Sequence, residues 1–82
     1  LYINNQRVDL TKNEFRILKL LLEHKNRLVS RDELMQALWE SENFIDDNTL
    51  TVNVARLRRK LEQNGLSRCI ETKKGLGYIL NA

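Results

Sequence analysis

The residues best placed to do chemistry in this 82-residue chain lie in the stretch NTLTVNVARLRRKL, from Asn48 to Leu61. Apolar residues recur there at the helical spacing i, i+4, i+7, i+11, which commits one side of a helix to a core. These residues are Leu50, Val54, Leu57 and Leu61. Successive residues of a helix are about 100° apart, so the opposite side can be read from the sequence. That side is basic and otherwise carries small side chains. It carries Asn48, Thr49, Val52, Ala55, Arg56 and Arg59, with Asn53, Arg58 and Lys60 on the flanks.

Such a face suits the major groove of DNA. Arginine hydrogen-bonds guanine edges there, and an aliphatic group contacts thymine methyls. A solvated amphipathic helix would give the same pattern, because runs of charge usually face water. The helix alone therefore leaves both interpretations open.

A second basic element follows at residues 70–80, with the sequence IETKKGLGYIL. This pattern predicts two short strands around a turn, where Gly75 and Gly77 supply the backbone freedom of a tight reversal. Lys73 and Lys74 lie beside the bend. A helix with a basic outer face, followed by a basic hairpin, is the layout of a winged helix-turn-helix.

Two capping-box patterns predict the helices that must hold the basic helix in place. Thr11 with Glu14 opens the first helix, and Ser30 with Glu33 opens the second. The third helix is expected to begin near Asp47 or Asn48.

The flanking segments complete the expected fold. Residues 1–3 and 7–10 alternate apolar and polar side chains, which predicts a short N-terminal hairpin, and 26–27 form a break between the first two helices. One core is expected, to which the first two helices contribute Phe15, Leu18, Leu21, Leu22, Leu34, Met35, Leu38 and Trp39.

Together these segments resemble the C-terminal effector domain of the OmpR/PhoB family of bacterial response regulators, over essentially all 82 residues. Residues 10–18 match its first helix, 29–34 open the second and Trp39 closes it, 49–61 match the recognition helix, and 72–78 match the wing. The segment DNTLTVNVARLRRKL is most similar to Gram-positive regulators that respond to cell-envelope stress and antimicrobial peptides. The chain departs from the family at Lys74, where many members have Arg, and at Asn53 and Ala55, where others carry larger or charged side chains.

The resemblance and the helix phase predict one α+β winged helix-turn-helix domain over residues 1–82, with three helices, a short N-terminal β-sheet and a C-terminal β-hairpin wing. We expect sequence-specific binding of double-stranded DNA, with the recognition helix 48–63 in the major groove and the wing 70–80 near the minor groove. We expect the base edges to be contacted by Val52, Arg56 and Arg59. Phosphates are assigned to Ser30, Arg31, Thr49, Asn53, Arg58, Lys60 and Thr72, and the wing contacts to Lys73, Lys74 and Gly75.

The resemblance also implies partners. It implies an N-terminal receiver domain, absent from this chain, that a sensor kinase phosphorylates and that brings a second copy onto tandem DNA sites. The connection 40–47 has four acids and no basic residue, and in the family this loop touches RNA polymerase. The residues in question are Glu40, Glu42, Asn43 and Asp46. Alternatively, Asp46 and Asp47 only favour the helix N-terminus while Phe44 and Ile45 fill the core, and both interpretations can hold.

Charge is divided unevenly along the chain. Residues 1–47 hold seven Lys and Arg against nine Asp and Glu, a net −2, whereas residues 48–82 hold seven against two, a net +5. The basic half contains the expected helix and wing. This asymmetry is typical of a domain with one face on nucleic acid.

Other functional classes are disfavoured. His24 and Cys69 are the only residues of their types, so no metal site, cofactor or catalytic constellation is expected. With no apolar run of membrane-spanning length and no signal sequence, we expect a cytoplasmic protein. The remaining rival is a winged-helix module that binds an acidic protein, although large aromatic side chains, which protein interfaces favour, are missing beside Arg56.

Overall fold

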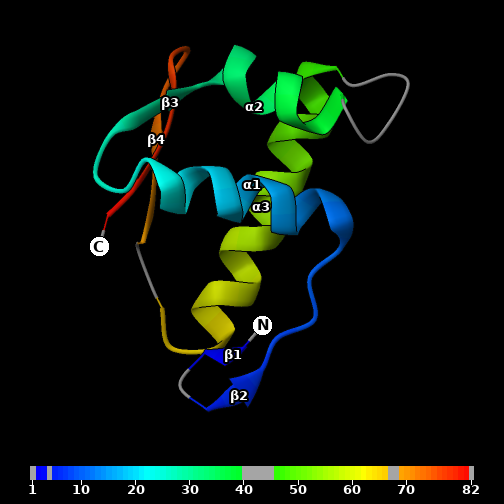
Figure 1. Ribbon diagram of the computed structural model, residues 1–82, viewed down its shortest axis with the longest axis vertical. Coiled ribbons are helices and arrows are strands. Elements are labelled where there is room, and N and C mark those ends of the chain that lie inside the picture. The colour runs from blue at the N-terminus through cyan, green and yellow to red at the C-terminus, as the bar shows by residue number, and fades with distance from the viewer. Residues whose placement is uncertain (1, 4, 40–45, 67–68, 82) are drawn as a thin grey trace.

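The computed structural model describes residues 2–3, 5–39, 46–66 and 69–81. Three helices surround a core that a small sheet closes on one side (Figure 1). The elements in chain order are β1 (Tyr2–Ile3), β2 (Gln6–Arg7), α1 (Lys12–Glu23), β3 (Leu28–Ser30), α2 (Arg31–Trp39), α3 (Asp47–Gln63), β4 (Ile70–Lys73) and β5 (Gly77–Leu80). The α+β winged helix-turn-helix architecture expected from the sequence is confirmed.

Both hairpins expected from the sequence are present, although the second strand of the N-terminal one is Gln6–Arg7 rather than residues 7–10. Strands β1 and β2 pair antiparallel in a sheet of their own, and Asn5 between them has φ 67°, a conformation that asparagine tolerates. Strands β4 and β5 form the wing, with Thr72 opposite Tyr78.

Strand β3 shows that the prediction of residues 29–34 as the start of the second helix is wrong in its first two residues. Residues 28–30 are instead extended and pair with β5, giving the strand order β3-β5-β4. The close approach depends on Gly77 opposite Ser30, because a Cβ added at Gly77 would lie 2.0 Å from the carbonyl oxygen of Val29. Three residues are too few for a periodic signal, and the pairing partner lies almost fifty residues away.

The helices begin where the capping patterns predict. Thr11 and Glu14 form a complete capping box, in which the Glu14 N–H donates to the Thr11 hydroxyl at 3.2 Å and the Thr11 N–H donates to Glu14 Oε1 at 2.8 Å. At α2 the Glu33 N–H donates to the Ser30 hydroxyl at 3.1 Å. Asp46 precedes α3, and its carboxylate accepts the Thr49 N–H at 2.7 Å.

The core is built around the apolar side of α3, as its periodicity predicts. Its buried members are Ile17, Leu18, Leu21, Val29, Leu34, Leu38, Leu50, Val54, Leu57, Leu61, Ile70, Tyr78 and Leu80. Three expected core residues are on the surface instead: Phe15 is 51% exposed, Leu22 49% and Trp39 52%. Phe15 and Leu22 each follow a buried residue of α1 and so point about 100° away from the buried side, whereas Trp39 ends α2.

Two further observations bear on functional class. None of the helices in the described ranges is long and apolar enough to cross a membrane. In that same part of the chain, no three potential ligands among His, Cys, Asp and Glu come together to hold a metal ion.

Candidate nucleic-acid interface

The outer side of α3 carries the side chains predicted to read DNA. Val52, Ala55, Arg56 and Arg59 are exposed, while Leu57 on the opposite side is completely buried. The helix phase inferred from the sequence is therefore confirmed. An exposed Val beside two exposed arginines gives this surface both an aliphatic group and planar hydrogen-bond donors, the two kinds of group that base edges engage.

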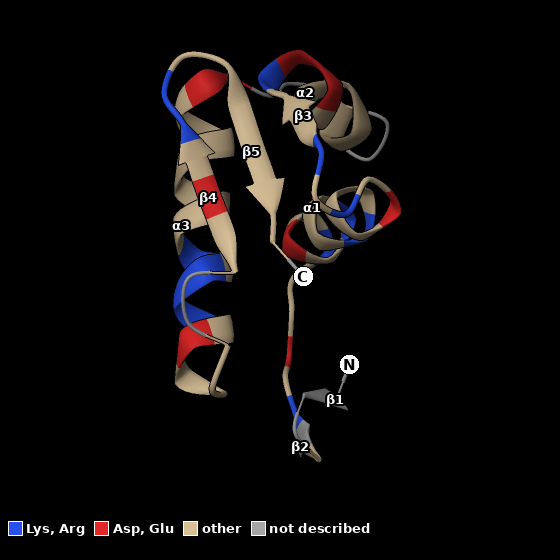
Figure 2. Ribbon diagram, turned by 90° about the vertical axis from the view of Figure 1, so that its left-hand side faces the viewer, with Lys and Arg blue, Asp and Glu red and all other residues tan. Residues whose placement is uncertain are grey.

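The wing lies alongside α3, with its basic residues at the turn between β4 and β5 (Figure 2). A hydrogen bond of 2.6 Å from Arg58 Nη2 to the hydroxyl of Thr72 joins the two elements. The helix and the wing therefore present their basic groups as parts of one surface.

The wing turn itself is tight and exposed. The N–H of Leu76 donates to the carbonyl of Lys73 at 2.9 Å, and Gly75 has φ +75° with open space where a Cβ would stand. Lys73 pairs with Glu71 at 2.5 Å, and this ammonium holds the pKa of the Glu71 carboxyl below its ordinary value. Lys74 in the turn is exposed. Because the Glu71 carboxylate offsets the charge of Lys73, Lys74 is the stronger phosphate candidate of the two.

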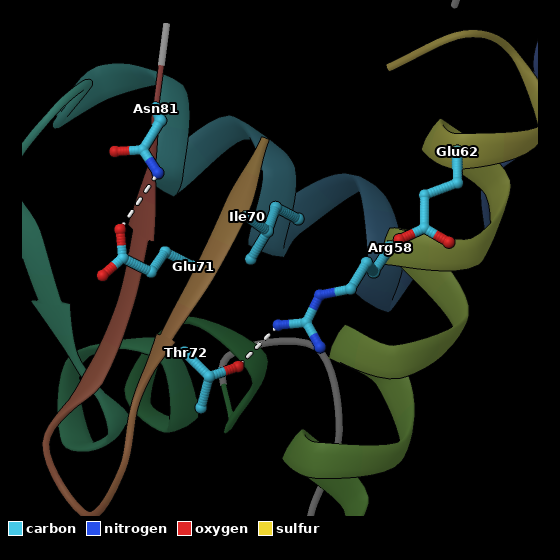
Figure 3. Close-up of a pocket in the computed structure, with 6 residues that line it drawn as sticks. All are labelled: Arg58, Glu62, Ile70, Glu71, Thr72 and Asn81. Atoms are coloured by element: carbon cyan, nitrogen blue, oxygen red, sulfur yellow. Dashed lines mark hydrogen bonds between the residues drawn. The ribbon is translucent and has the colours of Figure 1, made fainter. Parts of the chain in front are cut away.

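A groove of about 520 Å³ runs between the C-terminal half of α3 and β4 (Figure 3). Arg58 reaches across it to Thr72, and Asn81 donates a hydrogen bond to Glu71 at 3.2 Å. Glu62 and Glu71 also line the groove. Two carboxylates repel phosphate oxygens, so Glu62 and Glu71 make this groove a weaker candidate for phosphate than the outer side of α3 and the wing turn.

Lys60 does not face outward with the other basic residues of α3. Its ammonium donates to Glu14 Oε1 at 2.6 Å and to the carbonyl of Asp9 at 2.9 Å. This pairing argues against the predicted phosphate contact of Lys60, because its charge is paired with a carboxylate whose side chain is only 1% exposed.

The sequence pattern assigns Glu14 only to the capping box and does not predict its ion pair with Lys60. Burial would raise the pKa of its carboxyl, but hydrogen bonds from Lys60 and Thr11 outweigh burial and hold that pKa below its ordinary value. A signal was present in the sequence. Glu14 precedes Ile17 and Leu18 by three and four positions, which places it on the core side of α1.

Two more predicted phosphate contacts are engaged within the domain. Asn53 is buried, and its Nδ2 donates to the carbonyl of Thr49 at 2.8 Å, which argues against the predicted contact with a phosphate. The guanidinium of Arg31 is likewise taken up by partners in α3 and β5. In both cases the side-chain donors already have acceptors within the fold. Ser30 is half-buried, and its hydroxyl donates to Glu33 Oε1 at 3.2 Å.

The acidic connection before α3 is described only in part. Glu40, Glu42 and Asn43 lie outside the described residues. Asp46 caps α3, and its hydrogen bonds with Thr49 lower the pKa of its carboxyl. The capping interpretation of Asp46 is confirmed, and a contact with RNA polymerase stays a prediction.

His24 and Cys69 are the two residues that could suggest an enzyme, and neither lies in surroundings typical of a catalytic group. His24 ends α1, where its N–H donates to the carbonyls of Leu20 and Leu21. Burial raises the pKa of the Cys69 thiol, which lowers the fraction of reactive thiolate. Neither residue faces a second group that would activate it among the interactions described above.

Comparison with known proteins gives a consistent result. The family model described as "Transcriptional regulatory protein, C terminal" matches residues 5–80. The chain is 60% identical over 72 residues to the sensory transduction protein BceR of Halalkalibacterium halodurans, covering 88% of this chain and 31% of that protein. It is 52% identical over 75 residues to the response regulator protein GraR of Staphylococcus aureus, covering 92% and 34%. The chain thus spans about a third of the length of these relatives.

Solved structures agree with the sequence relatives. The C-terminal domain of the nisin resistance regulator NsrR, a lantibiotic response regulator, superposes with a TM-score of 0.83 at 42% identity, covering 96% of this chain and 80% of that one. The DNA-binding domain of the response regulator AdeR, solved in complex with an intercistronic region, superposes with a TM-score of 0.85 at 28% identity, covering 98% and 81%.

Proposed function

The chain belongs to the family of C-terminal domains of transcriptional regulatory proteins, with the OmpR/PhoB winged-helix fold, and from this we propose that it is the sequence-specific DNA-binding domain of a two-component response regulator. The family resemblance stated from the sequence is confirmed. The family is one of transcription regulators and not of enzymes.

One observation carries the assignment to duplex DNA: α3 buries its apolar side completely and presents Val52, Arg56 and Arg59 to solvent beside a basic wing. In the proposed complex α3 enters the major groove, where Arg56 and Arg59 donate to guanine edges and Val52 packs on a thymine methyl. The AdeR domain, whose structure holds an intercistronic region, supports this arrangement by its similarity.

In the proposed complex, the remaining basic and polar residues contact the sugar-phosphate backbone of the DNA. Arg58 and Thr72 form the corner between α3 and β4, where a phosphate could accept from both. The backbone N–H groups and Ser30 at the start of α2 and Thr49 on α3 add polar groups beside this surface. Lys74, with Gly75 beside it, meets the neighbouring minor groove, where a flexible point charge adds affinity with little choice of sequence.

The role of the full-length protein is proposed by analogy with relatives that are about three times as long as this chain. An N-terminal receiver domain, phosphorylated by a sensor kinase, would bring two copies onto tandem sites in the cytoplasm. The loop residues Glu40, Glu42, Asn43 and Asp46 would then contact RNA polymerase. Similarity to NsrR, a lantibiotic response regulator, supports a peptide antibiotic as the class of inducing signal.

A pair of matched variants tests the assignment of Arg56. Arg56→Ala removes an exposed charge from α3, and Lys19→Ala removes an exposed charge from α1, the helix that packs against the buried side of α3. Arg56→Ala should cost about 1–3 kcal/mol on the preferred duplex and much less on random duplexes. Lys19→Ala should change both affinities by less than about twofold.

Titration of labelled duplexes at fixed salt measures these affinities. An equal loss for Arg56→Ala on preferred and random duplexes would show that this arginine is not a base reader. An equal loss for both variants would reduce the role of α3 to general positive charge.

A further inference from the structure

The side chain of Arg31, at the start of α2, reaches two other elements of the DNA-binding face. Its Nη1 donates to the hydroxyl of Tyr78 in β5 at 3.0 Å. On α3, Nε donates to Asp47 Oδ1 at 3.2 Å, and Nη2 donates to the carbonyl of Asp47 at 2.8 Å and to the hydroxyl of Thr51 at 3.0 Å. Four of the five N–H groups of the guanidinium are therefore used inside the domain.

The backbone of Arg31 makes the same connection. Its N–H donates to the carbonyl of Leu76, in the wing turn, at 3.2 Å. Leu76 is 61% exposed, so this hydrogen bond fixes a part of the wing that side-chain packing does not. The wing is thus attached to residue 31 both at its turn and at Tyr78.

The partners leave little room for the guanidinium to move. Tyr78 is buried, with its ring centroid 5.9 Å from the guanidinium carbon, and the Arg31 side chain is only 23% exposed. Burial alone would lower the pKa of Arg31, but hydrogen bonds to Asp47 and Tyr78 raise it above the ordinary value, so the group stays charged. A planar fork with several donors is suited to joining such partners, and a lysine cannot reproduce it.

We infer that Arg31 is a positioning residue that couples the first turn of α3 to the wing, so that major-groove and wing contacts are made by one rigid surface. Arg31 acts on DNA through these two elements and does not itself hold a phosphate. This inference rests on the proposed function. Without this fork, the wing would have to be ordered on binding, and that ordering would reduce its contribution to affinity.

A double-mutant cycle that combines changes at Arg31 and at Lys74 on the wing measures this coupling between α3 and the wing. In the parent, Lys74→Ala weakens binding of the preferred duplex. In the Arg31→Gln background the same change should cost at least about threefold less, because the wing no longer sits in register with α3. Tyr78→Phe leaves every charge in place and removes one acceptor of the guanidinium, so it should reproduce part of this loss of coupling.

Salt dependence separates positioning from phosphate contact. A lost phosphate contact lowers the slope of log affinity against log salt by about 0.9. Tyr78→Phe removes no cation, so it should weaken binding while the slope falls by much less than about 0.9, because only part of the Lys74 contact is lost. If Lys74→Ala costs the same factor in the parent, Arg31→Gln and Tyr78→Phe backgrounds, and Arg31→Gln lowers the slope by about 0.9, Arg31 is a phosphate contact and the inference is overturned.

Amide hydrogen exchange of the free domain keeps this test independent of DNA. Arg31→Gln and Tyr78→Phe should both speed exchange at Gly75 and Leu76, and Arg31→Gln should also speed it in the first turn of α3. Unchanged exchange at the wing turn in both variants would contradict the coupling. If the parent binds no duplex at all, the proposed function fails, while the exchange result still decides whether Arg31 joins the two elements.

Discussion

Replacing Lys60 with methionine should destabilise the fold, because it leaves the carboxylate of Glu14 buried without its cation. The two groups lie 2.6 Å apart, and the Glu14 side chain is 1% exposed whereas that of Lys60 is 33% exposed. Breaking a buried ion pair from one side costs about 3–5 kcal/mol. Glu14 keeps the N–H of Thr11 as a donor, and water reaches the position of Lys60, so we expect a smaller loss of about 2–3 kcal/mol.

That loss is large for a domain of this size, whose whole free energy of unfolding is on the order of 4–12 kcal/mol. Adding Glu14→Gln to Lys60→Met should restore much of it, because the pair can be replaced by neutral groups at little cost. Lys19→Met, at an exposed position of α1, is the control and should stay within about 0.5 kcal/mol of the parent.

The pH dependence gives a second signature. In the parent the folded pKa of Glu14 lies below its ordinary value of 4.5, so the pair's contribution is present above that pH and is lost as pH falls through the folded pKa. In Lys60→Met burial acts without the ammonium and should raise the folded pKa above the unfolded one. Stability from protonation is then present at low pH and lost as pH rises, so the gap between variant and parent should narrow on acidification.

Urea unfolding followed by circular dichroism, at about pH 7 and about pH 5, measures both effects. If Lys60→Met unfolds at the same urea concentration as the parent at both pH values, the pair does not stabilise the domain. Lys60 would then be free to serve as the phosphate contact that the sequence suggested.

Three further predictions concern the wing and the face of α3. Gly77→Ala should lower stability by at least about 2 kcal/mol, because the new Cβ would meet the carbonyl of Val29 at 2.0 Å; Gly75→Ala should cost only the left-handed backbone strain of about 1–2 kcal/mol, and equal melting temperatures for the two variants would contradict this. Val52→Ser should change stability by less than about 0.5 kcal/mol and weaken binding, by a factor that shrinks when uracil replaces the contacted thymine; a large drop in melting temperature would mean that Val52 is core. Lys74→Ala should weaken binding to A·T-rich and G·C-rich flanks by similar factors, whereas Lys74→Arg should strengthen binding with a bias towards A·T-rich flanks; parent-like affinity of Lys74→Ala on every duplex would show that the turn does not touch DNA.

Local patterns made much of this fold predictable. The spacing of Leu50, Val54, Leu57 and Leu61 identifies the buried side of α3, and hence its exposed side, because a helix has one fixed period. The capping boxes predict the starts of α1 and α2 for a similar reason, since donor and acceptor lie within one turn.

Long-range partners could not be predicted in this way. Lys60 and Arg59 are neighbours of the same charge, yet only Lys60 folds back onto a carboxylate 46 positions away. Arg31 joins groups 16 to 47 positions away. The period of a helix states which side is buried, but where a long flexible side chain ends depends on acceptors that only the assembled fold brings near.

Selection of bound sites from a random duplex library tests the central claim most directly. The parent domain should enrich a defined sequence and bind it about a thousandfold or more tightly than scrambled duplex, with log affinity falling linearly with log salt. No enriched sequence, together with salt-insensitive or undetectable binding of duplexes and tight binding of an acidic protein surface, would contradict the account and identify the exposed side of α3 and the wing as a protein-docking face.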